Sequence, residues 1–326
     1  MAIFVYAETS AGMLRKASLE ASTYAAELAA AEGTEAQALV IGALPDTEVQ
    51  KLAAHGITRI YQMQDAALDS FAQRAYVTAI THMLTTAGGR VLVLPQTYNA
   101  RAIAPALSIR MDAALLSGVT SLPRKENGLQ VFDRPAFSGK GLEQIATASD
   151  RQIITVKANS YGVRTRATGA AEIISQAYQA APGDQAAKAK EIIRASTAIS
   201  LTEADKVVSG GRGLKGPENW GLVESLADVL QAATACSKPV ADVEWRPHHE
   251  HVGQTGIQIA PDLYIAIGIS GAIQHLAGVN SSKVIVVINK DPEAPFFKAA
   301  DYGIVGDAFE VVPRITQAIR EIKKAG

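Results

Sequence analysis

A glycine-rich segment at residues 209–217 carries the residue types and spacing that most clearly suggest chemistry. It reads SGGRGLKGP, follows a short apolar run, and matches the spacing GxGxxG from residue 211 to residue 216. Glycines so placed between a strand and a helix let the backbone approach a pyrophosphate, and Pro217 suits a first helical position. Glycine-rich turns also arise for steric reasons alone, so the pattern by itself is weak. Arg212 favours the nucleotide interpretation because a guanidinium can bind phosphate through two hydrogen bonds.

Two further polar segments could contribute to a ligand site. The first is HVGQTG at residues 251–256, and the second is GISGAIQHL at residues 268–276, directly after an apolar run. Ser270 is placed like a helix N-cap. Asn289 and Asp307 each follow an apolar run of their own. Because loops at the carboxyl ends of parallel strands form the ligand crevice of an α/β sheet, we expect these groups to converge on one nucleotide-sized site.

The first half of the chain alternates strand-like and helix-like segments. Short apolar runs, typical of buried strands, occupy residues 3–7, 38–41, 59–61 and 91–94. Apolar residues at helical spacing occupy residues 14–28, 49–54 and 71–84. This alternation predicts a parallel, doubly wound sheet. The loop at residues 8–12 lacks closely spaced glycines, so we do not expect this domain to bind a nucleotide.

The sequence pattern changes between residues 118 and 157. Short β-rich runs replace the alternation, with Asn127-Gly128 as a hairpin signal, which predicts an antiparallel extension of the first domain. The stretch 180–203 contains no strand pattern, so we place the domain boundary at Arg194, giving domains 1–194 and 195–326.

The second half predicts another parallel α/β domain. Strands are expected at residues 207–208, 261–268, 284–289 and 302–305. Helices are expected at residues 220–233 and along the closing segment that carries Ile315, Ala318, Ile319 and Ile322. The fold class is therefore α/β, with two doubly wound parallel-sheet domains.

Composition excludes several classes of function. Hydrophobic residues make up 48% and charged residues 19% of 326 residues, and the formal net charge is −1, so we expect no nucleic-acid partner. Cys236 is the only cysteine, which excludes an internal disulfide and a cluster of thiolates, so redox chemistry would need an organic cofactor. No apolar run approaches ~18 residues and no leader is evident, so we expect a cytoplasmic protein without membrane insertion.

The segment from Lys206 to Val312 closely resembles the C-terminal half of electron-transfer flavoprotein alpha subunits, the family that includes FixB. The motifs SGGRGLKGPENW, HVGQTG and PDLYIAIGISGAIQHLAGVNSSKVIVVINKDPEAPFFKAADYGIVGD carry the resemblance. It implies an extended FAD bound by a Rossmann-like second domain. It also implies a beta subunit that closes over the cofactor, with the first domain serving subunit contact.

The resemblance also implies a set of cofactor-binding residues. Arg212 would meet the phosphates, and Ser237 and Lys238 would lie beside the isoalloxazine. The flavin and ribityl end would be contacted by Gln254, Thr255, Ser270, Gln274 and His275. The adenosine half would be contacted by Asn289, Asp307 and the adjoining Ala308. Backbone contacts would come from Val252, Gly253, Gly271, Ala272 and Ile273.

Several of these positions admit a second interpretation. Most family members have Arg where this chain has Lys238, and Gln is often found in place of His251. His275 could simply cap or pack a helix, but we favour a donor to the flavin, neutral because the helix dipole opposes protonation. The histidines at 248, 249 and 251 lack partners for a metal site and are interpreted as loop residues. Cys236 is interpreted as a structural thiol.

The function implied is that of an electron carrier without a substrate of its own. It would take single electrons from flavin dehydrogenases and deliver them to a membrane quinone oxidoreductase. An NAD-dependent dehydrogenase is the alternative that GxGxxG allows; it needs an acid about 20 residues after the loop, where Asp242 lies loosely placed, but no catalytic His/Arg/Asp set follows. A structural partner whose ligand site has decayed is disfavoured because the polar groups of the loop segments are intact, whereas a subunit of an electron-bifurcating flavoprotein remains open.

Overall fold

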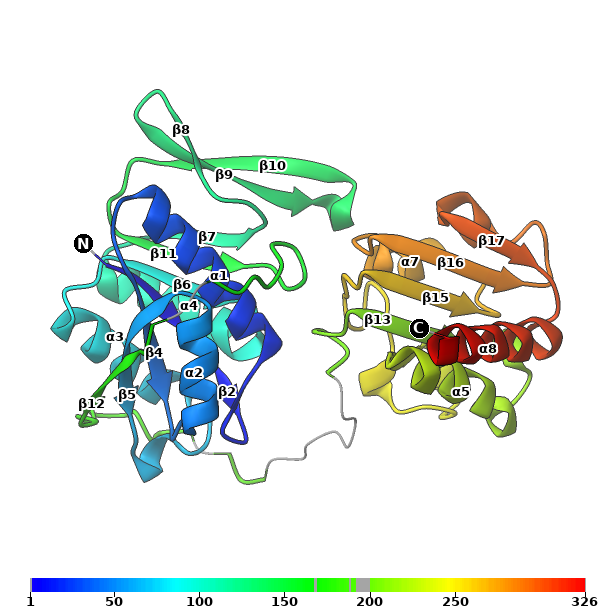
Figure 1. Ribbon diagram of the computed structural model, residues 1–326, viewed down its shortest axis with the longest axis horizontal. Coiled ribbons are helices and arrows are strands. Elements are labelled where there is room, and N and C mark those ends of the chain that lie inside the picture. Colours follow the sequence, from blue (N-terminus) through cyan, green and yellow to red (C-terminus); the bar gives the residue numbers. More distant parts are fainter. Residues whose placement is uncertain (1, 167–168, 188, 192–199, 326) are drawn as a thin grey trace. The chain divides into compact units, whose positions relative to one another are not determined.

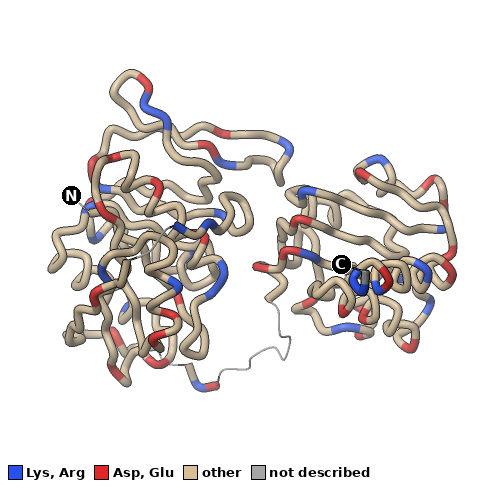
Figure 2. Tube along the Cα trace, viewed as in Figure 1, with Lys and Arg blue, Asp and Glu red and all other residues tan. Residues whose placement is uncertain are grey.

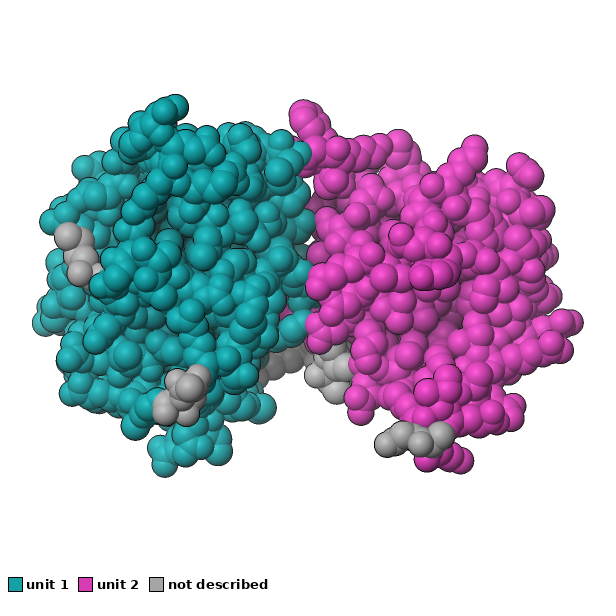
Figure 3. All heavy atoms as spheres, turned by 45° about the horizontal axis from the view of Figure 1, so that its top comes forward, with its two compact units in different colours: residues 1–135, 142–194 teal, residues 136–141, 195–326 magenta. Residues whose placement is uncertain are grey.

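The computed structural model describes residues 2–166, 169–187, 189–191 and 200–325. Contacts between Cα atoms divide the chain into two compact units, coloured separately in Figure 3. Unit 1 comprises residues 1–135 and 142–194, and unit 2 comprises residues 136–141 and 195–326. Lys and Arg residues are interspersed with Asp and Glu along both units (Figure 2), in keeping with the near-zero net charge.

Unit 1 is built on a seven-stranded sheet in the order β12-β5-β4-β1-β6-β11-β7 (Figure 1). Its strands are β1 (Ile3–Tyr6), β4 (Ala36–Ile41), β5 (Ile57–Met63), β6 (Val91–Pro95), β7 (Ala114–Val119), β11 (Gln152–Val156) and β12 (Glu172–Gln176). Every neighbouring pair is parallel. The predicted doubly wound sheet is therefore confirmed.

Helices cover both faces of this sheet. They are α1 (Lys16–Ala31), α2 (Asp46–Ala54), α3 (Gln73–Thr86) and α4 (Tyr98–Met111), with a 3₁₀ turn η1 (Ala66–Leu68). Successive residues of a strand point to opposite faces, so Val5 packs in the core with α1 while Phe4 packs in the core with α3 and α4. Both faces of β1 are thus buried, which explains its uninterrupted apolar sequence.

The antiparallel extension is confirmed for the middle of segment 118–157. Strands β8 (Arg124–Glu126), β9 (Leu129–Ala136) and β10 (Gly141–Thr147) form a separate sheet, with the 3₁₀ turn η2 (Phe137–Gly139) between the last two. The β8 and β9 strands pair antiparallel around Asn127 and Gly128, both at positive φ, as the hairpin signal predicts. The prediction was wrong for β11, which joins the parallel sheet between β6 and β7. A small hairpin, β2 (Thr9–Ser10) and β3 (Met13–Leu14), follows β1.

Unit 2 contains a five-stranded parallel sheet in the order β14-β13-β15-β16-β17. Its strands are β13 (Lys206–Gly210), β14 (Ala233–Cys236), β15 (Leu263–Ile267), β16 (Val284–Asn289) and β17 (Tyr302–Val305). The first strand of this unit is β13. The next strand, β14, pairs with one edge of β13, and the following strand, β15, pairs with the other edge, so the strand order reverses between β13 and β15. Open α/β sheets bind ligands at the carboxyl ends of the strands at such a switch point.

The remaining elements of unit 2 connect these strands. Its helices are α5 (Gly221–Leu230), α6 (Lys238–Asp242), α7 (Ile273–Val279) and α8 (Ala308–Ala325). Its 3₁₀ turns are η3 (Arg212–Leu214), η4 (Pro217–Asn219), η5 (His248–Glu250) and η6 (Pro295–Ala299). Residues of α5 and α8 share one core cluster with the sheet. The other core cluster includes Val279 of α7 and Phe296 of η6, so both faces of the sheet are covered.

The expected helix over residues 220–233 was too long. Gln231 adopts a left-handed φ of 53°, which ends α5, and Ala233 already begins β14. Within the part of the chain that the structure describes, no helix is both long enough and apolar enough to cross a membrane.

Candidate cofactor site

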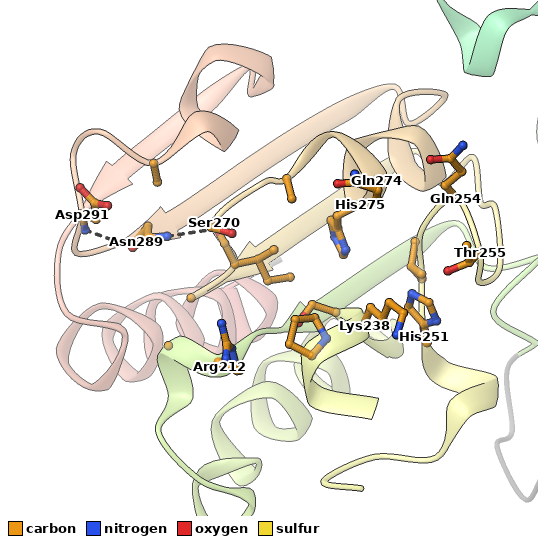
Figure 4. Close-up of a pocket in the computed structure, with 18 residues that line it drawn as sticks. Arg212, Lys238, His251, Gln254, Thr255, Ser270, Gln274, His275, Asn289 and Asp291 are labelled. Carbon is orange, nitrogen blue, oxygen red and sulfur yellow. Dashed lines mark hydrogen bonds between the residues drawn. The ribbon is translucent and has the colours of Figure 1, made fainter. Parts of the chain in front are cut away.

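A cavity of about 430 Å³ lies in unit 2 at the carboxyl ends of the strands around the switch point. This volume is within the range of small-molecule and cofactor sites. The predicted residues that line it are Arg212, Ser237, Lys238, Val252, Gln254, Thr255, Ser270, Ala272, Gln274, His275 and Asn289. In Figure 4, Arg212 and Asn289 lie toward one end of the cavity and Gln254 and Thr255 toward the other. The polar groups are therefore spread along an elongated site.

Three glycines bring the loops after β13 and β15 into direct backbone contact. The amide of Gly211 donates to the Ile267 carbonyl at 2.9 Å, and that of Gly213 donates to the Gly268 carbonyl at 3.0 Å. A Cβ at Gly211 would lie 2.3 Å from the Gly268 oxygen, and a Cβ at Gly213 would lie 2.6 Å from the Gly268 Cα. The first two glycines of GxGxxG thus serve loop packing, and their amides are already used within the protein.

Arg212, the predicted phosphate ligand, lies in the same glycine loop. Its side chain is exposed and lines the cavity. Among the described residues, its guanidinium forms no hydrogen bond or ion pair. An arginine without an internal partner at a cavity wall can offer its paired N–H donors to an anionic ligand. Lys215 in the same loop instead lies over the Phe309 ring, with Nζ 4.7 Å from the ring centroid.

Lys238 brings a second positive charge to the cavity, at the start of α6. Its Nζ lies 2.7 and 2.6 Å from the two carboxylate oxygens of Asp242, and this hydrogen bond lowers the pKa of the Asp242 carboxyl. The Lys238 side chain remains 56% exposed. Ser237, buried at the N-cap position of α6, lies beside it on the cavity wall.

His251 lines the cavity although the sequence interpretation treated it as an ordinary loop residue. It is buried, and burial followed by the nearby Lys238 charge lowers its pKa, so the ring is held toward its neutral form. The signal that could have identified it was its position at the head of the HVGQTG motif. Within the described residues, no three His, Cys, Asp or Glu side chains cluster as a metal site.

His275 lies on α7 and contributes a buried imidazole, 7% exposed, to the cavity (Figure 4). Its Nε2 is 2.8 Å from the Tyr264 hydroxyl, whereas its buried Nδ1 has no hydrogen-bond partner among the residues that the structure describes. Burial, and then the neighbouring His251, lower the pKa of His275 to about 4. The ring is therefore neutral near pH 7, and burial is the main cause, where the sequence had suggested a helix dipole.

Ser270 is not the N-cap that its position suggested. The N-cap of α7 is Ala272, without a side-chain hydrogen bond, so the helix starts two residues later than a Ser270 cap requires. The Ser270 side chain is exposed on the cavity wall, and its carbonyl accepts a hydrogen bond from the Phe296 amide at 3.0 Å. The serine hydroxyl is thereby left to the cavity.

Asn289 lies toward the same end of the cavity as Arg212 (Figure 4). Its Nδ2 donates to the Ile269 carbonyl at 3.0 Å and its Oδ1 accepts from the Asp291 amide at 3.1 Å, so the side chain bridges two loops (Figure 4). Asp307 and Ala308 do not line this cavity. The Asp307 carboxylate accepts from the Phe309 amide at 2.9 Å at the start of α8, and Ala308 is buried in the core.

The other predicted residues outside the cavity wall shape the loops that carry it. Gly271 has φ +80°, and a Cβ there would lie 2.4 Å from the Phe296 Cβ. Gly253 packs against Gly278, and Ile273 is an exposed residue at the start of α7. The lining residues absent from the predicted set are Gly213, Pro239, His251, Gly268, Ile269, Asp291 and Ala294.

Comparison with known proteins decides the family. Residues 200–280 match the family model described as the electron transfer flavoprotein FAD-binding domain, and residues 3–200 match the electron transfer flavoprotein domain. The chain belongs to the electron transfer flavoprotein alpha-subunit family. It is 36% identical to the electron transfer flavoprotein subunit alpha of Thermoanaerobacterium thermosaccharolyticum, with 98% of each chain covered.

Other family members are similar over their whole length. The chain is 33% identical to the Bacillus subtilis electron transfer flavoprotein subunit alpha, covering 98% of each chain. It is also 33% identical to protein FixB of Clostridium saccharobutylicum, covering 99% of this chain and 97% of that one. The predicted family is confirmed, and FAD is the cofactor of its second domain.

The residues of the cavity fit this family's cofactor. FAD combines an anionic pyrophosphate with a planar ring that carries carbonyl acceptors. Arg212, without an internal partner, suits the pyrophosphate, and the unpartnered Nδ1 of His275 suits a ring carbonyl. A buried donor without a partner is destabilising unless a ligand completes its hydrogen bond. The elongated distribution of polar groups also suits an extended dinucleotide (Figure 4).

Proposed function

We propose that this chain is the alpha subunit of a heterodimeric electron-transfer flavoprotein that takes single electrons from flavin dehydrogenases and delivers them to a membrane quinone oxidoreductase. The observation that carries the proposal is the cavity at the switch point of unit 2, where a neutral buried imidazole and an arginine with no partner among the described residues line one site. The chain itself transforms no substrate in this proposal. Its location in the cytoplasm stays a prediction.

Bound FAD would supply the redox chemistry, and the residues of the chain would bind and orient it. Arg212 would hold the pyrophosphate through charge-assisted hydrogen bonds. Asn289 would lie toward the adenosine end, with Asp307 and Ala308 acting through the start of α8. Gln254, Thr255, Ser270 and Gln274 would hydrogen-bond to the ribityl chain and flavin, and backbone contacts would come from Val252, Gly253, Gly271, Ala272 and Ile273.

Two residues would tune the flavin. Lys238, next to Ser237, would place a positive charge near the ring and so favour its reduced, more negative form. His275 would donate a hydrogen bond from its neutral N–H to a ring carbonyl. This hydrogen bond would strengthen as negative charge develops on the carbonyl oxygen. Because both groups are fixed before the electron arrives, they stabilise the charge without a reorganisation of solvent.

The two domains would have different roles. Residues 195–326 would bind FAD, while residues 1–194 would contact the beta subunit. The relatives are named as alpha subunits, which supports a partner chain for this protein as well. Whether the heterodimer only carries electrons or bifurcates them depends on a second flavin in that partner.

The alternative of an NAD-dependent dehydrogenase is less well supported. In a dinucleotide-binding βαβ unit, the glycine loop approaches the pyrophosphate and an acid holds the ribose. Here the amides of Gly211 and Gly213 donate to neighbouring carbonyls instead. Asp242, the acid at the loosely matching distance, is bound by Lys238.

Co-expression with the beta subunit encoded by the same organism tests the proposal. The purified complex is expected to be yellow, to contain the two chains in equal amounts, and to be reduced by a flavin dehydrogenase with its substrate. Counting flavin and AMP per heterodimer separates a carrier from a bifurcating complex. A colourless chain that binds NAD in preference to FAD would refute the proposal.

A further inference from the structure

Tyr264 makes the hydrogen bond that holds the imidazole of His275. Tyr264 lies in the middle of β15 and is fully buried, and its hydroxyl is 2.8 Å from the Nε2 of His275. The imidazole also meets the Phe296 ring edge-on, with ring centroids 5.7 Å apart. The side chain is therefore fixed at one nitrogen by Tyr264 and in its plane by Phe296.

We propose that Tyr264 is a positioning residue for the cofactor site: its hydroxyl donates to Nε2 of His275, which places the ring proton on Nδ1 as a donor for FAD. The inference rests on the proposed role of this cavity as the FAD site. Tyr264 acts only through His275 and does not line the cavity itself. Tyr264 lies outside the GxGxxG, HVGQTG and GISGAIQHL segments.

Two observations set the direction of this hydrogen bond. Burial keeps both partners neutral near pH 7, because it lowers the pKa of His275 to about 4 and raises the pKa of Tyr264. One hydrogen atom must then lie between the two side chains, either on the phenol or on Nε2. Among the described residues the Tyr264 hydroxyl has no other hydrogen bond of normal geometry, so its buried O–H is satisfied only if it donates to Nε2. The proton of the neutral ring then lies on Nδ1.

Ser209 supports the same direction from the other side. Its buried Oγ lies on the neighbouring strand β13 and acts to lower the pKa of Tyr264, as a hydroxyl donating toward the phenol oxygen does. Among the described residues, the Ser209 hydroxyl forms no hydrogen bond of normal geometry with any other group. The direction of donation is therefore from Ser209 toward Tyr264 and from Tyr264 to His275.

The consequence lies at the unpartnered nitrogen. The buried Nδ1 of His275 has no hydrogen-bond partner within the described part of the chain, so the Nδ1–H remains available to a ligand. The other tautomer would present a lone pair at Nδ1 and would repel a carbonyl oxygen of the flavin. By fixing the tautomer, Tyr264 decides whether His275 is a donor or an acceptor toward the cofactor.

Tyr264→Phe tests the inference, since phenylalanine keeps the ring in the core and removes only the hydroxyl. Wild type and variant, each in complex with the beta subunit, are labelled with ¹⁵N-histidine, and long-range ¹H–¹⁵N correlations report the tautomer. His275→Gln assigns the resonance. Wild type is expected to show a single Nδ1–H tautomer. In the variant the neutral ring loses its donor, so the pKa of His275 should rise toward the ordinary value of 6.5.

Controls separate positioning from packing. Ser209→Ala, one step further away, should shift the His275 titration in the same direction by less. The variant's flavin potential should become more dependent on pH as His275 begins to titrate. An Nε2–H tautomer in wild type, or an unchanged tautomer and titration in Tyr264→Phe, would overturn the inference while leaving FAD binding intact. Loss of FAD from wild type would instead overturn the proposed function, and the tautomer of the FAD-free complex would still test Tyr264.

Discussion

The two units have the same kind of sheet but fill its switch point differently. In unit 1 the strand order reverses between β1 and β6, and Glu8 follows β1. The buried Glu8 carboxylate accepts from Asn99 at 3.0 Å and from Thr97, and it pairs with Arg15 at 3.2 Å. In unit 2, at the corresponding reversal, Arg212 has no internal partner among the described residues and the Nδ1 of His275 has none either.

This difference shows what makes a switch point a binding site. The topology places polar side chains at the strand ends in both units. In unit 1 these side chains satisfy one another, so the position stabilises the fold. In the described part of unit 2, Arg212 and the Nδ1 of His275 remain unpaired, so a ligand can complete them. The comparison can be tested by substitutions that should affect folding in unit 1 and cofactor binding in unit 2.

The largest effect is expected for Glu8→Ala. It leaves Arg15, Thr97 and Asn99 without their shared buried acceptor, which should destabilise unit 1 by roughly 2–4 kcal/mol. Chemical denaturation measures the loss. Glu8→Gln, which keeps one carbonyl acceptor, should lose less. The flavin content of the folded complex should not change, and a fall in FAD affinity would contradict the division between the units.

The next effect is expected for Arg212→Ala. Removing one charge-assisted interaction worth roughly 1.5–3 kcal/mol should weaken FAD binding by about ten- to a hundred-fold. Titration of the FAD-free complex with FAD measures this. Lys215→Ala is the matched control, because Lys215 carries the same charge in the same loop but lies over Phe309. Equal losses in both variants would indicate a general charge effect instead of a phosphate contact.

A smaller effect is expected for Gly213→Ala. The new methyl group would lie 2.6 Å from the Gly268 Cα, so the two loops must separate, at roughly 1–3 kcal/mol of folding free energy. FAD affinity should fall because the loop that carries Arg212 shifts. Gly221→Ala, with open space around its Cβ position, should be neutral or slightly stabilising in helix α5. A stable Gly213→Ala variant with full FAD affinity would show that the loop contact is dispensable.

The smallest effect is expected at Lys238, whose charge is largely exposed and already paired with Asp242. Lys238→Ala should lower the flavin potential by on the order of tens of millivolts, reduced by solvent screening. Asp242→Asn should raise it, because the lysine charge is then no longer neutralised. Lys238→Arg keeps the charge and should shift the potential least. Spectroelectrochemical titration compares the three variants, and potentials equal to wild type would place Lys238 away from the ring.

Much of the fold was predictable because its signals are local. Apolar runs predicted β1, β4, β5 and β6 of the first sheet and β13, β15, β16 and β17 of the second, and Asn127-Gly128 predicted the hairpin. The end of α5 was missed because Gln231, a residue type that rarely adopts a left-handed conformation, ends the helix there. The strand β11 was placed in the extension because its pairing with β6 and β7 joins segments that are distant in the sequence.

The cavity wall was predictable only in part, because many of its contacts also join segments that are distant in the sequence. Loop motifs located Arg212 and His275, but no sequence pattern reveals which amides are already bound, as those of Gly211 and Gly213 are. Asp307 looked like a ligand because it follows a strand, whereas its carboxylate caps α8. The Tyr264 contact depends on a strand and a helix that meet only in the folded domain.

The single cysteine of the chain has a practical consequence for spectroscopy. Cys236 is buried in β14, and burial raises the pKa of its thiol to about 12, so almost none of the reactive thiolate exists at pH 7. A maleimide reagent should therefore leave the native protein unlabelled. A cysteine introduced at an exposed position of each unit would then take a spin label or fluorophore without background. Distances between two such labels would measure the separation of the two units in solution.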